Sequence, residues 1–230
     1  MPNIENNITA VQRRLQQAAR DAGRNPEDIL LLAVSKTRSS AQVSLAQSAG
    51  IQSFGENYLQ EASDKITQLG GQGLDWHFIG PLQSNKTRQV AEQFAWVHTV
   101  DRLKIAQRLS AQRPVTMPAL NICLQINIDN EESKSGFSPE QALSMAATIA
   151  QLPNLRLRGL MAIPRPRANI VEQQQPFAQL AALQKEINST LDNCEKLDTL
   201  SMGMSADLEA AIAEGATIIR VGTDIFGPRS

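Results

Sequence analysis

The sequence predicts an α/β protein built as a single (β/α)8 barrel of the TIM type, with one additional helix at its amino-terminal end. Eight short apolar segments of strand character recur along the chain, and each is followed by a helical pattern or, after the last, by a short turn. The length of 230 residues suits one barrel, for which about 250 residues is typical. No linker or low-complexity segment divides the chain, so we expect residues 1–230 to form one domain. An open doubly wound sheet is the alternative, but no G-x-G-x-x-G motif follows the first predicted strand.

The first element is an amphipathic helix that ends near Gly23. Its apolar residues recur at steps of three and four, the spacing of one helix face, and they are Ile4, Ile8, Val11, Leu15, Ala18 and Ala22. This helix covers either the bottom of the barrel or its outside. The first strand is the continuous apolar run over residues 29–34, which fits a strand buried on both faces. The other seven strands are expected at residues 51–57, 76–80, 96–100, 120–128, 155–163, 199–204 and 217–223.

Helix signals fill the segments between these strands. Ser39 or Ser40 is a suitable N-cap for a helix that ends at Gly50. Ser138-Pro139-Glu140-Gln141 is a capping box with proline at the first helical position, and it opens a helix that runs to about residue 152. Asp101 is the predicted cap of a helix that contains Leu103 and Leu109, and Ser205 is the predicted cap of a helix over residues 206–214. The remaining helices are expected over residues 58–69, 85–94 and 171–191, and Gly70-Gly71 ends the first of these.

Composition narrows the class of protein. The formal net charge is −1, so there is no electrostatic reason to expect nucleic acid or an anionic membrane as a partner. The amino terminus lacks the features of a signal peptide, and no apolar run approaches the ~20 residues of a membrane span. Cys123 and Cys194 belong to no CxxC pair, so neither a disulfide framework nor a zinc site is expected. We therefore expect a cytoplasmic protein in a reducing compartment.

Lys36 is the candidate reactive residue. It follows the first predicted strand at its carboxyl end, where α/β barrels bind their ligands. A lysine held there against apolar neighbours can have a lowered pKa and attack a carbonyl as an amine nucleophile. The alternative is a lysine that reaches solvent from the end of the strand. His77 and His98 lie inside predicted strands and are expected to be hydrogen-bonded core residues, so no metal site is expected.

The loops after the seventh and eighth strands are the usual phosphate site of this barrel. Ser201-Met202-Gly203-Met204-Ser205 lies before a predicted helix, whose first backbone N–H groups favour an anion, and Gly222-Thr223 allows a close approach of the backbone. Ordinary helix capping and a turn glycine are the alternative. Arg220 lies in an otherwise apolar strand, which is costly unless the side chain forms an internal ion pair or faces a ligand. A lysine, a phosphate site and an arginine between them describe pyridoxal phosphate held as an imine.

Seven longer motifs cover nearly the whole chain. They are Leu32-Ala33-Val34-Ser35-Lys36-Thr37, Phe54-Gly55-Glu56-Asn57-Tyr58, residues 76–86, Ser133-Lys134-Ser135-Gly136, Arg158-Gly159-Leu160-Met161, residues 201–205 and residues 220–227. With them the chain closely resembles the pyridoxal phosphate homeostasis proteins, also called the YggS or PROSC family. The resemblance implies a barrel similar to the amino-terminal domain of alanine racemase, in which Lys36 forms a Schiff base with pyridoxal 5'-phosphate. It also implies that Ser205, Gly222 and Thr223 hold the phosphate and that Asn57 and Met161 line the ring. Arg220 would face the pyridine nitrogen, and Ser201 and Met204 would lie close by.

The resemblance implies a binding protein that stores, buffers and delivers pyridoxal phosphate, and not an enzyme. Apo pyridoxal-phosphate enzymes are then the expected partners. Because the second domain of alanine racemases is not expected here, we expect a monomer. The alternative is a weak amino-acid racemase or isomerase, in which Lys36 is one base and water or Tyr58, the only tyrosine, is the other. A third hypothesis is a cofactor-free Schiff-base aldolase acting on a sugar phosphate. Lys134 matches a family lysine in a loop near the site, and Lys134 or Arg38 is a candidate second docking point, although a solvated loop lysine is the alternative.

Overall fold

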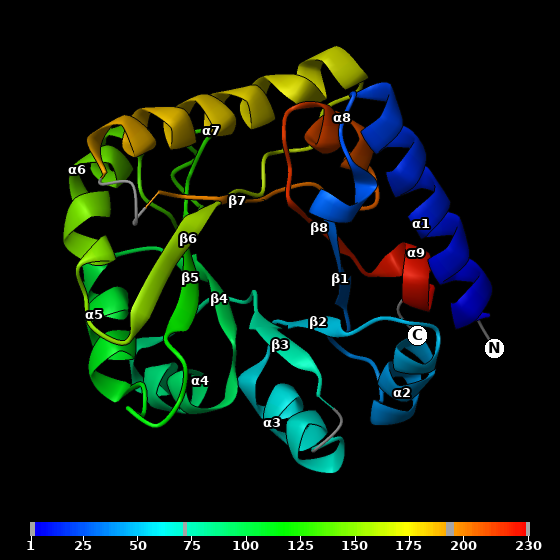
Figure 1. The fold of residues 1–230 in the computed structure, drawn as a ribbon, viewed down its shortest axis with the longest axis horizontal. Helices are drawn as coiled ribbons and strands as arrows, with labels where there is room; N and C mark the ends of the chain where they lie inside the picture. The colour runs from blue at the N-terminus through cyan, green and yellow to red at the C-terminus, as the bar shows by residue number, and fades with distance from the viewer. Residues whose placement is uncertain (1–2, 71–72, 192–195, 229–230) are drawn as a thin grey trace.

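The structure is a computed structural model, and it describes residues 3–70, 73–191 and 196–228. Within these residues eight parallel strands close into a barrel in chain order, because β1 pairs with β8 as well as with β2 (Figure 1). The predicted (β/α)8 barrel is therefore confirmed, and the open doubly wound sheet is wrong. Gly71, expected to help end a helix, and Cys194 lie outside the described residues.

The strands are short and mostly buried, as expected for a parallel sheet covered by helices. They are β1 (Leu30–Val34), β2 (Ser53–Glu56), β3 (Asp75–Phe78), β4 (Trp96–Val100), β5 (Leu120–Gln125), β6 (Leu155–Met161), β7 (Thr199–Ser201) and β8 (Ile218–Val221). The largest differences from the predicted ends are in β5 and β7, each of which ends three residues earlier than predicted. After β5, Ile126 makes only an isolated bridge to Phe137. After β7, Gly203 takes a φ of +90°, which turns the chain out of the sheet.

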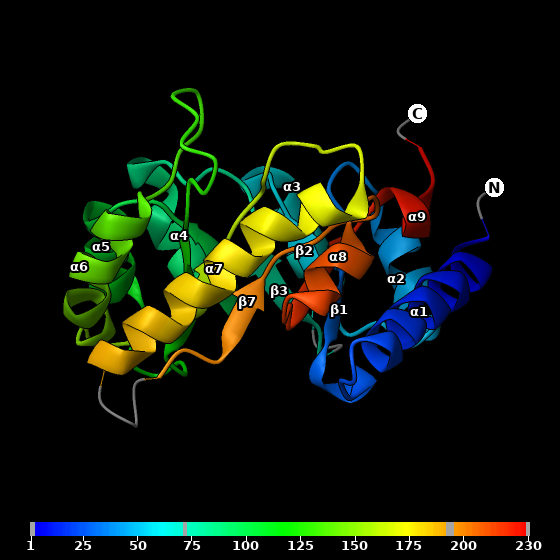
Figure 2. The same cartoon turned by 90° about the horizontal axis from the view of Figure 1, so that it is seen from above.

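Helices surround the barrel in both views (Figures 1 and 2). They are α1 (Ile4–Asp21), α2 (Ser40–Ser48), α3 (Leu59–Gln68), α4 (Thr87–Gln93), α5 (Leu103–Gln112), α6 (Pro139–Ala150), α7 (Ile170–Thr190), α8 (Leu208–Ala213) and α9 (Thr223–Phe226), with short 3-10 turns η1 (Pro26–Asp28) and η2 (Ser84–Lys86). The extra helix α1 packs on the outside of the barrel against α8 and α9, so the position over the bottom is wrong. Its predicted apolar face is buried from Ile4 to Ala18, because the spacing of three and four places those residues on one side, and Ala22 is the half-buried C-cap.

Two of the predicted N-caps were confirmed, and two were wrong because a neighbouring charged side chain forms a different contact. Ser39 and Ser138 both form complete capping boxes. Ser205 does not cap α8. The chain forms a turn instead, in which the Met204 N–H donates to the Asp207 carboxylate at 2.6 Å, and α8 begins only after Asp207. Asp101 does not cap α5 either, because its carboxylate pairs with the Arg102 guanidinium at 2.7 Å.

Candidate functional site

The residues predicted to form a ligand site lie on one continuous arc of the barrel rim. They come from the ends of five neighbouring strands, β6, β7, β8, β1 and β2. Because all strands are parallel, their carboxyl ends face the same end of the barrel. In barrel order the residues are Met161, then Ser201, Met204 and Ser205, then Arg220, Gly222 and Thr223, then Lys36, then Asn57.

Lys36 lies one residue beyond a buried charge cluster that the sequence prediction missed. The carboxylate of Glu56 accepts hydrogen bonds from the Ser35 hydroxyl at 2.6 Å and from the Lys65 ammonium at 2.7 Å. The same ammonium donates to the Ser35 carbonyl oxygen at 2.7 Å. Glu56 is 0% exposed and Lys65 is 5% exposed, so the pair is screened little by water. Burial raises the pKa of Glu56, while the hydrogen bond and the charge of Lys65 pull it back down.

A signal for this cluster was present in the sequence. Lys65 lies three residues after Ala62 and four before Leu69, and both of these are buried. A lysine on the apolar stripe of an amphipathic helix requires a buried partner. The identity of that partner depends on how α3 packs over β2, which the spacing of one helix does not determine.

Arg220 is the charged group at the centre of the arc. It belongs to β8 and is 4% exposed. Its guanidinium donates to the Ser201 hydroxyl at 2.8 Å and to the Ala162 carbonyl oxygen at 3.0 Å. Within residues 3–70, 73–191 and 196–228 no carboxylate lies within ion-pair distance of it, so an internal ion pair is not its role there. Burial lowers the pKa of Arg220 to about 10, and the charge of Asp207 raises it, so the side chain is protonated at neutral pH.

A chain of buried hydrogen bonds continues from Arg220 into the barrel. The Ser201 hydroxyl lies 2.7 Å from Nδ1 of His98, and Nε2 of His98 lies 2.9 Å from Nδ1 of His77. Burial lowers the pKa of His77 to about 3 and that of His98 well below its ordinary value, so both rings are neutral. Since Arg220 can only donate, the bonds are satisfied when Ser201 donates to His98 and His98 donates to His77. Both histidines are therefore hydrogen-bonded core residues, as predicted.

The loops after β7 and β8 carry the other predicted contacts. Gly222 lies against β1, where an added Cβ would be 3.2 Å from the Val34 carbonyl oxygen, so a side chain here would press on the end of β1. Ser205 is half-buried, whereas Met204 and Thr223 are exposed at the rim. Met161 is buried and pairs with Ser201 across the ladder from β6 to β7.

Arg14 of α1 links these two loops, which the sequence prediction also missed. Its guanidinium donates to the Ser205 carbonyl oxygen at 3.1 Å and pairs with Asp224 of α9 at 2.8 Å. A third contact joins it to Glu209 of α8 at 2.9 Å. The extra helix thus has a structural connection to the region in which the phosphate site was predicted.

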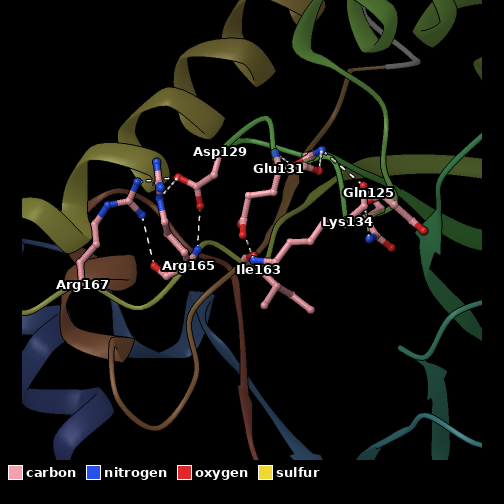
Figure 3. Close-up of polar contacts among 9 residues, drawn as sticks. Gln125, Asp129, Glu131, Lys134, Ile163, Arg165 and Arg167 are labelled. Atoms are coloured by element: carbon pink, nitrogen blue, oxygen red, sulfur yellow. Dashed lines mark hydrogen bonds and ion pairs between the residues drawn. The ribbon is translucent and has the colours of Figure 1, made fainter.

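A cavity of about 350 Å³ lies beside this arc, at the ends of β2 to β6. Its lining includes Asn57, whose side-chain oxygen is buried without a hydrogen-bond partner among the described residues. Lys134 also lines the cavity, and Figure 3 shows its ammonium beside Glu131, at 2.7 Å, and the Ile163 carbonyl oxygen, at 3.1 Å. In the same view Asp129 joins the loop after β5 to Arg165 and Arg167 of the loop after β6. Lys134 thus joins its own loop after β5 to the segment after β6, and its predicted role as a docking point stays a prediction.

Among the described residues, no group of three or more histidine, cysteine, aspartate or glutamate side chains is arranged to hold a metal ion. Nor does any helix among them combine the length and the apolar character that a membrane crossing requires. A larger cavity, of about 840 Å³, lies at the opposite end of the barrel, where Leu30 begins β1, and contains none of the predicted site residues.

Comparison with known proteins assigns this chain to a family. The family "Alanine racemase, N-terminal domain" matches residues 3–230. The chain is 57% identical to the pyridoxal phosphate homeostasis protein of Pseudomonas aeruginosa, with 100% of this chain and 97% of the relative covered. It is 51% identical to the protein of the same name from Escherichia coli K12, with coverage of 100% and 98%. The chain belongs to the family of pyridoxal phosphate homeostasis proteins, so the resemblance noted in the sequence is confirmed.

Solved structures agree with this assignment. The structure of PipY from Synechococcus elongatus PCC7942 with PLP bound is similar with a TM-score of 0.85 and 34% identity, over 98% of this chain and 100% of that one. The alanine racemase of Corynebacterium glutamicum is similar with a TM-score of 0.71 over 96% of this chain and 61% of that one. At 13% identity this second likeness shows the shared barrel alone.

Proposed function

We propose that the protein binds pyridoxal 5'-phosphate as a Schiff base on Lys36, and that it stores the cofactor, keeps the free aldehyde low and delivers it to apo-enzymes. The observation that carries the proposal is the buried, protonated Arg220, which has no carboxylate partner among the described residues and lies between the strand of Lys36 and the loop of Ser205. The names of the relatives and the PLP bound to PipY support it. The whole chain would act as one cofactor-binding unit.

The side chains on the arc fit this cofactor chemically. Lys36 supplies a primary amine for the aldehyde carbon. The hydroxyls of Ser205 and Thr223 and the close backbone of Gly222 suit a phosphate, because each offers a hydrogen-bond donor at the strand ends. Asn57 and Met161 would line the ring, with Ser201 and Met204 close by. The unpartnered side-chain oxygen of Asn57 is consistent with a ligand that completes its hydrogen bonding.

Arg220 favours storage over catalysis. Bound pyridoxal phosphate supplies an electron sink when its ring nitrogen is protonated. A guanidinium with a pKa of about 10 stays protonated at neutral pH, so Arg220 can only donate to that nitrogen and would leave it without a proton of its own. This arrangement disfavours reactions that need a strong electron sink.

The racemase alternative requires a second proton-transfer group. Tyr58 is the only tyrosine, and it is 53% exposed at the start of α3. No hydrogen bond among the described residues holds its hydroxyl in place, and a placed acid–base group contributes about 10²–10⁴-fold. The relatives are named for homeostasis and not for catalysis. Incubation with single amino-acid enantiomers in D₂O tests the alternative, because exchange faster than with free cofactor would support it.

The first experiment is a spectrum of the purified protein after addition of pyridoxal phosphate. We expect a visible Schiff-base band, and borohydride reduction followed by peptide mapping should place the label on Lys36. Lys36→Ala should lose the band, whereas Lys86→Ala, which removes an exposed lysine, should keep it. Absence of the band from the wild-type protein would contradict the proposal and revive the cofactor-free aldolase.

Delivery and subunit number need separate measurements. Holo-protein is mixed with an apo-enzyme that depends on pyridoxal phosphate while a scavenger traps the free cofactor. Recovery of activity is expected, and its absence would contradict delivery while leaving storage intact. Sedimentation equilibrium should give the mass of one chain, and a dimer would contradict the proposed monomer.

A further inference from the structure

The geometry points to Glu61 and Lys65 of α3 as positioning residues for Lys36. Together they hold the backbone on both sides of this lysine and thereby set the direction in which its side chain leaves the chain. The inference rests on the proposed function, because it assigns to these residues a role in Schiff-base formation by Lys36. Neither residue belongs to the predicted ligand contacts.

The contacts lie one on each side of Lys36. On the amino-terminal side, the Lys65 ammonium donates to the Ser35 carbonyl oxygen at 2.7 Å. On the carboxyl-terminal side, the Thr37 N–H donates to the Glu61 carboxylate at 2.9 Å. Glu61 and Lys65 are four residues apart and therefore share a face of α3. One rigid helix thus fixes both peptide groups that flank the reactive lysine.

The backbone at this point would not hold its shape without support. Thr37 has a φ of +61°, in the left-handed region that β-branched residues rarely adopt. Such a conformation persists only where the surroundings impose it, and it is often found at functional sites. The Arg38 N–H closes the turn by donating to the Ser35 carbonyl oxygen at 3.0 Å. If the contact with Glu61 is lost, Thr37 is expected to relax and the Cα–Cβ bond of Lys36 to rotate with it.

The anchor of this arrangement is buried. Lys65 also donates to Glu56 of β2 at 2.7 Å, and Glu56 accepts from the Ser35 hydroxyl at 2.6 Å. Lys65 therefore connects α3 to the barrel wall below Lys36. The contact with Glu61 lies at the surface, so it can be removed without opening the core. Glu61 is for that reason the residue to test.

The kinetic test compares two cofactor forms. In Glu61→Ala we expect the rate constant of Schiff-base formation with pyridoxal phosphate to fall about tenfold or more, because small misplacements of a reacting group are costly. Affinity for pyridoxine phosphate, which has the phosphate and ring but no aldehyde, should be unchanged. Glu61→Gln keeps an acceptor oxygen and should restore most of the rate. Asp64→Ala removes a carboxylate from the exposed side of the same helix and should behave as wild type.

A second measurement needs no cofactor. Hydrogen exchange of the Thr37 amide in the unloaded protein should accelerate in Glu61→Ala and not in Asp64→Ala. In a Thr37→Gly background the kinetic loss from Glu61→Ala should shrink, because glycine adopts a positive φ without strain.

The outcomes are distinct. A wild-type rate in Glu61→Ala, or an equal loss of pyridoxine phosphate affinity, would overturn the positioning role. Failure of the wild-type protein to label Lys36 would instead overturn the proposed function, and the exchange of the Thr37 amide would still report whether Glu61 holds the turn.

Discussion

Replacing Lys65 by methionine tests how much the buried cluster beside Lys36 contributes to stability. Methionine resembles the lysine side chain in length and apolar character, so packing changes little, but the hydrogen bonds to Ser35 and Glu56 are lost. The Glu56 carboxylate, 0% exposed, is then left without a counter-charge. Removing one partner of a buried ion pair costs about 3–5 kcal/mol, a large part of the ~5–15 kcal/mol by which most proteins are stable.

The size of this loss should depend on pH. Burial already raises the pKa of Glu56, and without Lys65 it should rise further. A carboxyl whose pKa is higher in the folded state contributes most below its unfolded pKa, and this contribution is lost as the pH rises through the folded pKa. The deficit of Lys65→Met relative to wild type should therefore be smaller at about pH 5 than at about pH 8.

Urea unfolding at the two pH values measures both effects. The double variant Glu56→Gln/Lys65→Met removes the unpaired charge and should be less destabilised than Lys65→Met alone. Lys104→Met, on the exposed side of α5, should stay within about 0.5 kcal/mol of wild type. A loss below about 1 kcal/mol, or one independent of pH, would refute the reasoning, because it would mean that the carboxylate finds another partner.

Two further predictions concern the rim and the barrel wall. Arg14→Ala should weaken the binding of pyridoxine phosphate, measured by calorimetry, because the loops of Ser205 and Asp224 lose their common contact. The loss of stability should be only about 1 kcal/mol, because the ion pair is half-exposed. An unchanged affinity would contradict this prediction. Gly159→Ala should lower the free energy of unfolding by about 3 kcal/mol or more, because the new Cβ would lie 1.7 Å from the Thr199 carbonyl oxygen of β7 and force β6 and β7 apart. An unchanged urea midpoint would contradict this prediction, because it would show that the two strands can separate at little cost.

The parts of the fold that depend on local patterns could be predicted from the sequence. Apolar runs located all eight strands, since a buried parallel strand needs apolar residues on both faces. The capping box at Ser138 was predicted because its groups are only three residues apart, whereas at the earlier helix the sequence left Ser39 and Ser40 as alternatives, of which Ser39 is the N-cap. Ser205 and Asp101 failed because each N-cap prediction ignored a competing neighbour, the Asp207 carboxylate in one case and the Arg102 guanidinium in the other.

The supporting contacts of the site could not be predicted, because they join distant segments. Arg14 and the Ser205 carbonyl oxygen are 191 residues apart in the chain. Glu56 meets Lys65 only through the packing of α3 on β2. Lys36 and Arg220 were predictable as candidates because each is a charged residue in or beside an apolar strand, which needs an explanation on its own.

The closure of the barrel has a consequence for how the site comes into being. The β1 ladder with β8 pairs Leu30 with Ile218 and Ala33 with Val221, so the strand of Lys36 and the strand of Arg220 touch only in the closed ring. These partners are 188 residues apart in the sequence (218 − 30), and contacts between such distant segments are expected to form late because closing a long loop is entropically unfavourable. Incompletely folded chains would therefore have the amine of Lys36 but not yet the neighbouring strand that carries Arg220. Binding of the cofactor should thus report that folding is complete. A bound ligand should in turn oppose separation of β1 from β8.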